Sequence, residues 1–180
     1  MTKNILTFGI IAGFLISTFM LISMNSMSHC EGSADYNTSM IMGYAAMLIA
    51  FSLVFVGIRN YRNKFGNGSI TFGKAFKIGA GIVLVASTMY VIAWQIDYFF
   101  FMPDFMDKYS ARMLEELRNS GATQAAIDSK SKEMADMAVM YKNPLFNSLI
   151  TYAEIVPIGL LVTLISSLIL KKKAIVTTVG

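Results

Sequence analysis

Four long apolar segments divide this chain, at residues 5–24, 40–58, 78–96 and 145–170. The first three carry no charged side chain, and the fourth carries one carboxylate, Glu154. A helix of about 20 apolar residues is long enough to cross the ~30 Å hydrocarbon core of a bilayer. The pattern therefore predicts an all-α integral membrane protein, with four transmembrane helices in a single membrane domain over residues 1–180.

The composition agrees with this prediction. Hydrophobic residues make up 55% of the chain, and the mean hydropathy is +0.57, which is above the range of an ordinary soluble domain. We expect membrane lipids to surround the protein. The net charge of +4 follows the membrane topology, so it does not predict a nucleic-acid partner, and no motif predicts a cofactor.

The basic residues predict the orientation. The loop at 25–39 has no Lys or Arg, whereas the loop at 59–77 has five and no acid, and Lys171, Lys172 and Lys173 follow the last span. Short loops rich in Lys and Arg remain in the cytoplasm. We therefore expect a multi-pass protein of the cell (inner) membrane with both termini cytoplasmic, and with residues 97–143 outside.

Residues 104–141 predict an extracytoplasmic helical hairpin between the third and fourth spans. Apolar residues recur every four positions along its first half, as on one face of an amphipathic helix: Phe105, Tyr109, Met113 and Leu117. Asp104 and Asp107 form an acidic variant of a capping box, and Thr123 is placed to cap the second helix. The two apolar faces can pack on each other, lie on the outer leaflet or bind a partner protein.

Aromatic residues gather at the predicted outer end of the third span: Trp94, Tyr98, Phe99, Phe100 and Phe101. Aromatic rings are enriched at both membrane–water boundaries. We interpret this group as a belt that anchors the span.

Small residues recur at four-residue spacing on two spans. They are Gly9, Gly13 and Ser17 on the first, and Gly159, Thr163 and Ser167 on the fourth. Such stripes let two helices approach closely in lipid, and Gly43, Gly79 and Ala86 suggest similar contacts on the other spans. The spacing leaves open whether these contacts form within one chain or between copies in a homo-oligomer.

Glu154 is the sharpest candidate for a functional residue. It lies roughly 13 Å into the last span at helical rise, where a carboxylate is costly and normally faces the protein interior. Tyr90 and Gln95 lie at a similar depth on the third span, and Asp97 shares a helical face with Tyr90. This intramembrane polar site is either a buried acid that fixes helix register, which we favour, or a proton or cation site.

Two other motifs carry little weight. Gly68–Ala75 has the spacing of a phosphate loop, but it lacks the final Ser or Thr that holds Mg²⁺. Met27, His29, Cys30 and Glu31 offer metal-ligand types within one loop, but metal sites need fixed geometry and usually a second segment. Cys30 is the only cysteine, so it is either a free thiol or an intermolecular link. We expect no catalytic and no metal residues.

The chain resembles an uncharacterised family of bacterial multi-pass membrane proteins, domain of unknown function 4199. The resemblance covers nearly the whole chain and rests on six segments: GYAAMLIAFS from Gly43, FVGIRNYR from Phe55, ITFGKAFK from Ile70, FMPDF from Phe101, YKNPLF from Tyr141 and EIVPIGL from Glu154. It implies a bacterial membrane protein and gives no residue a catalytic role.

Two functions remain for comparison. One is a non-enzymatic scaffold or assembly protein that presents the outer hairpin to a partner. The other is a small proton or cation transporter or channel subunit built around Glu154. A membrane-embedded enzyme is the third class, but the spans offer no nucleophile–base pair and no metal-ligand set.

Overall fold

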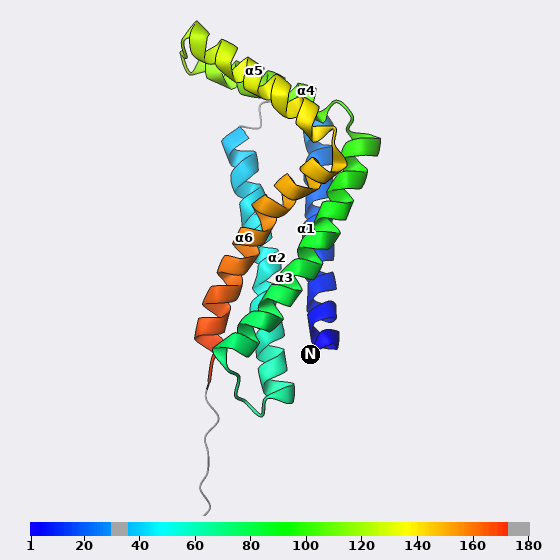
Figure 1. Cartoon of the computed structure of the whole chain (residues 1–180), viewed down its shortest axis with the longest axis vertical. Helices are drawn as coiled ribbons and strands as arrows, with labels where there is room; N and C mark the ends of the chain where they lie inside the picture. Colours follow the sequence, from blue (N-terminus) through cyan, green and yellow to red (C-terminus); the bar gives the residue numbers. More distant parts are fainter. Residues whose placement is uncertain (30–35, 173–180) are drawn as a thin grey trace, which may run out of the picture. The chain divides into compact units, whose positions relative to one another are not determined.

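The computed structural model describes residues 1–29 and 36–172, with side chains at 1–24 and 41–172. These residues are almost entirely helical (Figure 1). The elements are α1 (Thr2–His29), α2 (Tyr36–Phe65), α3 (Phe72–Ile96), the π-helical segment η1 (Asp97–Phe101), α4 (Phe105–Asn119), α5 (Gln124–Tyr141) and α6 (Pro144–Leu170).

Four helical segments are long and apolar enough to cross a membrane, which confirms four predicted spans, although the second and third extend five to seven residues beyond the predicted ends. They are Thr2–Met24, Ile41–Phe65, Phe72–Phe101 and Pro144–Leu170. The all-α membrane fold is therefore as predicted. The polar region between the third and fourth spans forms α4 and α5, also as predicted.

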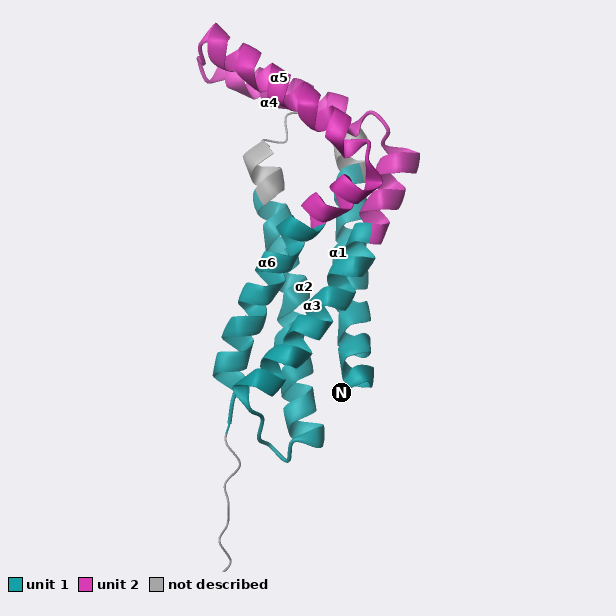
Figure 2. Cartoon of the chain, viewed as in Figure 1, with its two compact units in different colours: residues 1–91, 152–180 teal, residues 92–151 magenta. Residues whose placement is uncertain are grey.

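The chain forms two compact units (Figure 2). Unit 1 comprises Met1–Val91 and Tyr152–Gly180, and unit 2 comprises Ile92–Thr151. Unit 1 contains α1, α2, most of α3 and most of α6, and unit 2 contains α4 and α5 with the adjoining ends of α3 and α6.

In unit 1, α3 packs closely against each of the other three helices, because small residues line its contacts. A Cβ atom added at Gly9 of α1 would lie 2.7 Å from Val85 Cβ, and one at Gly57 of α2 would lie 2.5 Å from Ile82 Cδ1. On the α6 side, a Cβ at Gly79 would lie 2.5 Å from Thr163 Cγ2. Backbones can approach this closely only where a side chain is absent or short.

The predicted stripes on the first and fourth spans are thus buried within one chain. Ser17 and Ser167 at their ends are buried too. The prediction for Gly43 was wrong, since an added Cβ there meets no atom within 4 Å. Gly43 lies in the first part of α2, where no described residue comes close enough to require a missing side chain.

The core of unit 1 is mainly apolar, but it also buries Ser87, Thr163 and Ser167, whose hydroxyl oxygens have no hydrogen-bond partner among the described residues. Its fully buried side chains include Phe51, Val54, Ile58, Ile82 and Ile155. Beside it, the partly buried Tyr152 hydroxyl of α6 donates to Thr88 Oγ1 of α3 at 2.9 Å. Thr88 in turn donates to the Leu84 carbonyl oxygen at 2.8 Å, so both hydroxyls are satisfied inside the span.

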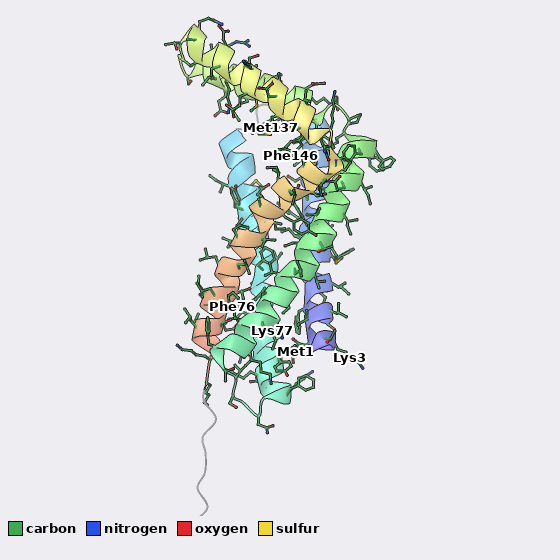
Figure 3. All side chains as sticks on the ribbon, in the orientation of Figure 1. Met1, Lys3, Phe76, Lys77, Met137 and Phe146 are labelled. Atoms are coloured by element: carbon green, nitrogen blue, oxygen red, sulfur yellow. The ribbon has the colours of Figure 1, made fainter. Side chains whose placement is uncertain are left out.

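The basic residues of unit 1 gather at one end. Lys3 and Lys77 lie at the end where α1 begins (Figure 3). The α2–α3 connection reaches the same end and pairs with the residues after α6, because Ile70 and Lys172 exchange backbone hydrogen bonds of 3.0 and 2.9 Å. Arg62 Nη1 also donates to the Leu170 carbonyl oxygen at 3.4 Å. This clustering is what the orientation rule requires, and the side of the membrane remains a prediction.

The segment with phosphate-loop spacing is a turn and a helix start. Asn67 and Gly68 both have positive φ, at 46° and 79°. Thr71 then caps α3, since its hydroxyl oxygen accepts from the Lys74 amide at 3.4 Å. In the described residues no parallel sheet accompanies the segment, so the geometry that would aim backbone amides at a phosphate is missing here.

In unit 2, α4 and α5 lie side by side (Figure 2). Gly121, at φ 76°, breaks the chain between them, and Thr123 caps α5 by accepting from the Ala126 amide. Met106, Ile127 and Met134 are buried, and the predicted α4 face is partly buried at Phe105, Tyr109, Met113 and Leu117, so the apolar faces of the two helices are partly covered within unit 2. Of the three alternatives for these faces, the structure favours packing on each other.

Of the predicted helix caps, the one at the start of α4 is not formed. Asp104 makes no side-chain capping bond; its carboxylate pairs instead with Lys108 Nζ at 2.8 Å, and this hydrogen bond lowers the pKa of Asp104. The pair at four-residue spacing competes with the backbone for the carboxylate. Asn143 caps α6, accepting from the Leu145 amide at 2.9 Å, and Pro144 takes the first helical position, where its missing N–H costs nothing.

Candidate functional site

Glu154 does not face the interior of unit 1. Its side chain is exposed on the outer surface of α6, and in the described residues it makes no hydrogen bond or ion pair. Tyr90, its expected partner, is only partly buried and packs against the apolar core of unit 1. The prediction that Glu154 faces the bundle was therefore wrong.

The rotation of α6 about its own axis explains this outcome. Gly159 must face inward, because a Cβ there would lie 2.5 Å from Val83 Cγ1 and 3.0 Å from Phe51 Cζ. At 100° per residue, Glu154 lies about 140° away around the helix. Close packing along Gly159, Thr163 and Ser167 therefore turns the carboxyl group outward, toward the surface that lipid or another protein must cover.

The backbone carbonyl of residue 153, next to Glu154, also lacks its usual helical hydrogen bond. Pro157 lies inside α6, and it has no N–H to donate to the carbonyl of residue 153, four positions earlier. Ala153, Glu154 and Pro157 are all exposed. A carboxylate facing hydrocarbon costs about 2.5–3.5 kcal/mol on insertion scales, and an unpaired carbonyl in lipid adds to that cost.

The other two residues of the predicted polar site lie in unit 2. Gln95 Nε2 donates to Asn147 Oδ1 and Ser148 Oγ, both at 3.0 Å, and approaches the Pro144 carbonyl oxygen at 3.3 Å. Since an amide nitrogen has two hydrogens, these contacts use its whole donor capacity. The amide thus ties the end of α3 to the first turn of α6, which is a structural role.

Asp97 begins the π-helical segment, and its carbonyl oxygen accepts from the Met102 amide at 2.9 Å. The residue is 9% exposed. Its Oδ2 has no hydrogen-bond partner among the described residues, and neither does Asn147 Nδ2. Ser87, Trp94 and Asp97 of the third span are all buried, but Glu154 is not part of this group.

A cluster of aromatic side chains connects the helices of unit 2. Trp94 meets the Phe105 ring edge-on at 5.0 Å between centroids and meets Tyr98 at 5.8 Å. Tyr98 also contacts Tyr141 at 6.0 Å. The same network includes Tyr109, stacked on Phe105 at 6.0 Å, and Phe146, at 6.2 Å from Tyr141. The cluster therefore joins the end of α3 to α4, α5 and α6.

The predicted aromatic belt is accordingly only partly correct. Phe99, Phe100 and Phe101 are exposed at 37%, 78% and 74%, as a lipid-facing belt requires. Trp94 and Tyr98 are instead buried, with exposed fractions of only 7% and 5%. The π-helical turn changes the direction of the side chains at this point, and sequence periodicity gave no signal of that turn.

Comparison with known proteins identifies the family. The family model described as protein of unknown function, DUF4199, matches residues 7–172. The chain belongs to the DUF4199 family. No curated protein and no solved structure matches it.

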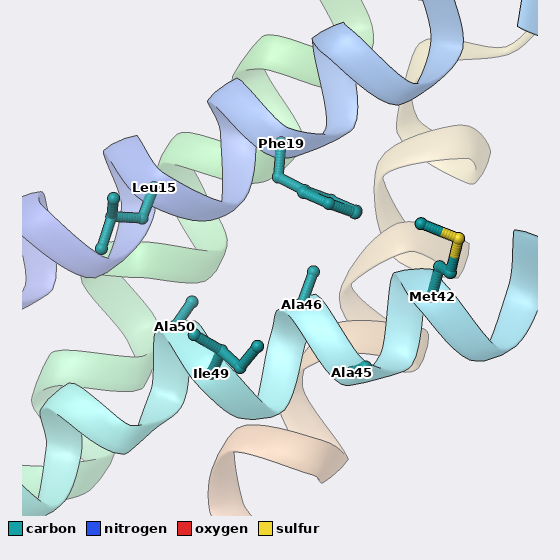
Figure 4. A pocket seen from close by; sticks show the side chains of 7 residues that line it. All are labelled: Leu15, Phe19, Met42, Ala45, Ala46, Ile49 and Ala50. Atoms are coloured by element: carbon teal, nitrogen blue, oxygen red, sulfur yellow. The ribbon is translucent and has the colours of Figure 1, made fainter. Parts of the chain in front are cut away.

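In this DUF4199 protein, an apolar cavity lies between α1 and α2 in unit 1 (Figure 4). Its volume is about 380 Å³. Phe19 of α1 projects across it toward Ala46 of α2, and the rest of the lining is Leu15, Met42, Ala45, Ile49 and Ala50. None of these side chains can hydrogen-bond strongly or ionise, so the cavity suits an acyl chain or an apolar side chain and offers no path for an ion.

The described residues contain no group of three His, Cys, Asp or Glu side chains that could hold a metal ion. Cys30 and Glu31 lie outside the described residues, as do the side chains of Met27 and His29. The described residues therefore do not test the hypothesis of a metal cluster in that loop.

Proposed function

We propose that this protein is a non-enzymatic membrane scaffold that presents the α4–α5 pair to a partner protein outside the membrane. The observation that supports the proposal most is how unit 2 is built. An aromatic cluster around the buried Trp94 and Tyr98, a Thr123 cap and partly covered apolar faces support a fixed arrangement of the two polar helices. Rigid presentation lowers the entropic cost of binding a partner.

The exposed surface of the pair indicates what kind of partner would fit. The outer surface of the pair carries charges of both signs, with Arg112, Glu115, Glu116, Asp128, Lys132 and Asp136 all exposed; Val139 and Met140 of α5 are exposed as well. Surface charges steer association and set specificity more than they set affinity. A polar, extracytoplasmic domain with complementary charges is the expected partner.

The alternative, a small proton or cation transporter built around Glu154, has less support. The core of unit 1 is mainly apolar and its buried polar side chains are uncharged, and Glu154 lies on its outside. A path that uses Glu154 would have to be lined by several copies of the chain.

The scaffold proposal predicts position-specific crosslinking in native membranes. A photoreactive amino acid at Glu116 or Asp128 should capture a distinct second protein, because both side chains point outward from the helix pair. The matched control is Asn63, an exposed residue at the end of α2, which should not capture that protein. The products are compared by mass spectrometry.

Charge reversal tests the same contact without disturbing the core. Glu115→Lys with Glu116→Lys should reduce capture and co-purification roughly ten-fold or more, in line with the several kcal/mol that like-charge contacts cost, while leaving membrane levels unchanged. If positions 116 and 128 capture no more than position 63, or if charge reversal leaves the co-purifying proteins unchanged, the scaffold proposal fails.

A further inference from the structure

Glu154 offers a hydrogen-bond donor, and the Ala153 carbonyl offers an acceptor, on a surface that the described residues of unit 1 leave exposed. A carboxyl group in hydrocarbon takes up a proton and becomes a hydrogen-bond donor. Ala153 directly precedes Glu154. Its carbonyl is a free hydrogen-bond acceptor, because Pro157 has no N–H to donate to it. In a membrane neither group can turn to water, so both require a partner.

The same surface continues along α6 with the spacing of a helix–helix seam. From Glu154 the exposed residues follow at alternating steps of three and four: Pro157, Leu161, Leu164 and Leu168. This 3–4 alternation is the heptad pattern by which two helices pack side by side at a small crossing angle. Leu161 is 56% exposed and Leu168 is 47% exposed, so unit 1 leaves the seam open.

We infer that this surface binds a second copy of the same chain, as a parallel two-fold dimer through α6. Two copies in one membrane have the same orientation, so a two-fold axis along the bilayer normal brings equal depths together. In this dimer, Glu154 of each copy and the partner's Ala153 carbonyl differ in membrane depth by only one residue's rise, about 1.5 Å. Each Glu154 carboxyl donates a hydrogen bond to the partner's Ala153 carbonyl. The dimer therefore has two such bonds, and each copy's carboxyl and carbonyl are both paired.

Self-complementarity favours a second copy over a different protein. The surface offers one donor and one acceptor side by side, so its own copy supplies what it lacks. A partner that neutralised an ionised Glu154 would instead have to bring a Lys or Arg to mid-membrane, which is costly. The inference does not depend on the scaffold proposal, which concerns unit 2.

Cysteine crosslinking of the full-length protein in native membranes tests the seam. In a Cys30→Ser background, Leu161→Cys or Leu168→Cys should form disulfide-linked dimers upon mild oxidation. Ile49→Cys, on an exposed part of α2 (71% exposed), is the matched control and should remain monomeric. Equal crosslinking at 49 and 161, no crosslinking at 161 and 168, or crosslinking to a different protein would overturn the inference.

A double-mutant cycle tests the chemistry of the contact. Glu154→Leu removes the donor, and Pro157→Ala restores an N–H to the Ala153 carbonyl and so removes the free acceptor. Neither change should impair folding, since one removes a polar group from lipid and the other repairs a helix. Each should weaken dimerisation about three- to tenfold, the range of an interhelical hydrogen bond in membranes, as measured by energy transfer at varied protein density in lipid.

The decisive comparison is between the single and the double variants. Because both substitutions break the same hydrogen bond, Pro157→Ala should have little further effect once Glu154 is leucine. Glu154→Gln, which keeps a donor, should retain most of the dimer. Unchanged dimerisation in Glu154→Leu, independent losses that simply add, or a protein that is monomeric at every density would refute the inferred contact.

Discussion

Replacing Gly159 by alanine is expected to destabilise the protein by about 1–3 kcal/mol, the range of overpacking in a well-packed core. The new methyl group would lie 2.5 Å from Val83 Cγ1 and 3.0 Å from Phe51 Cζ. Val83 is 1% exposed and Phe51 is fully buried, and a β-branched side chain has little rotamer freedom. The helices must therefore separate. The measurement is the free energy of unfolding in mixed detergent micelles.

Gly43→Ala is the matched control for this substitution. It makes the same chemical change in another span, at a position where an added Cβ meets nothing within 4 Å. We expect its free energy of unfolding to be unchanged or slightly raised, because alanine favours the helix over glycine. Equal losses at positions 43 and 159 would show that α6 does not pack through Gly159.

Trp94→Ala is expected to have the largest effect in unit 2, a local loss of about 3–5 kcal/mol, as for other buried aromatic truncations. The indole is 7% exposed and contacts both Phe105 of α4 and Tyr98 of η1. Its removal should loosen the contact of α4 with the end of α3, since Phe105 loses the ring that it meets edge-on at 5.0 Å. Amide hydrogen exchange should become faster along α4 and α5, with little change in α1 and α2.

The control for this prediction is Phe100→Ala, six residues further along the chain. Phe100 is 78% exposed, so its truncation leaves the cluster intact and should leave exchange in α4 and α5 as in the unmodified protein. If Trp94→Ala leaves the protection of α4 unchanged, the aromatic cluster does not hold the helix pair in place.

Hydrophobic patterning predicted the spans and the two polar helices because both depend on local sequence. Length and apolarity define a span, and the Thr123 cap and the Gly121 break depend on a few neighbouring residues. The Asp104–Asp107 box failed for the same local reason. Lys108 competes for the Asp104 carboxylate at four-residue spacing, and the capping pattern alone takes no account of that competitor.

Glu154 shows where sequence reasoning reached its limit. The small-residue stripe through Gly159 and the inward carboxyl of Glu154 were each plausible alone, but they lie on opposite sides of α6. Only one could face the core. The steric requirement at Gly159 is strict, whereas a carboxyl group can be satisfied by another molecule. Weighing the two predictions on one helical projection would have revealed the conflict.

The aromatic cluster could not have been predicted from pattern. Trp94, Phe105, Tyr141 and Phe146 come from four helices, and their contacts depend on the π-helical turn after α3. The partners of Gln95 lie about fifty residues away in the sequence. Spacing along one segment carries no information about such contacts.

The central prediction is that the chain crosses the membrane four times, which would put α4 and α5 on the side opposite to the α2–α3 connection. Labelling of single cysteines with a membrane-impermeant maleimide on intact cells, in a Cys30→Ser background, tests it most directly. Ser120→Cys, between α4 and α5, should react at once, and Asn63→Cys, at the end of α2, should react only after the membrane is permeabilised. Reaction of both positions in intact cells, or protection of position 120, would contradict the account.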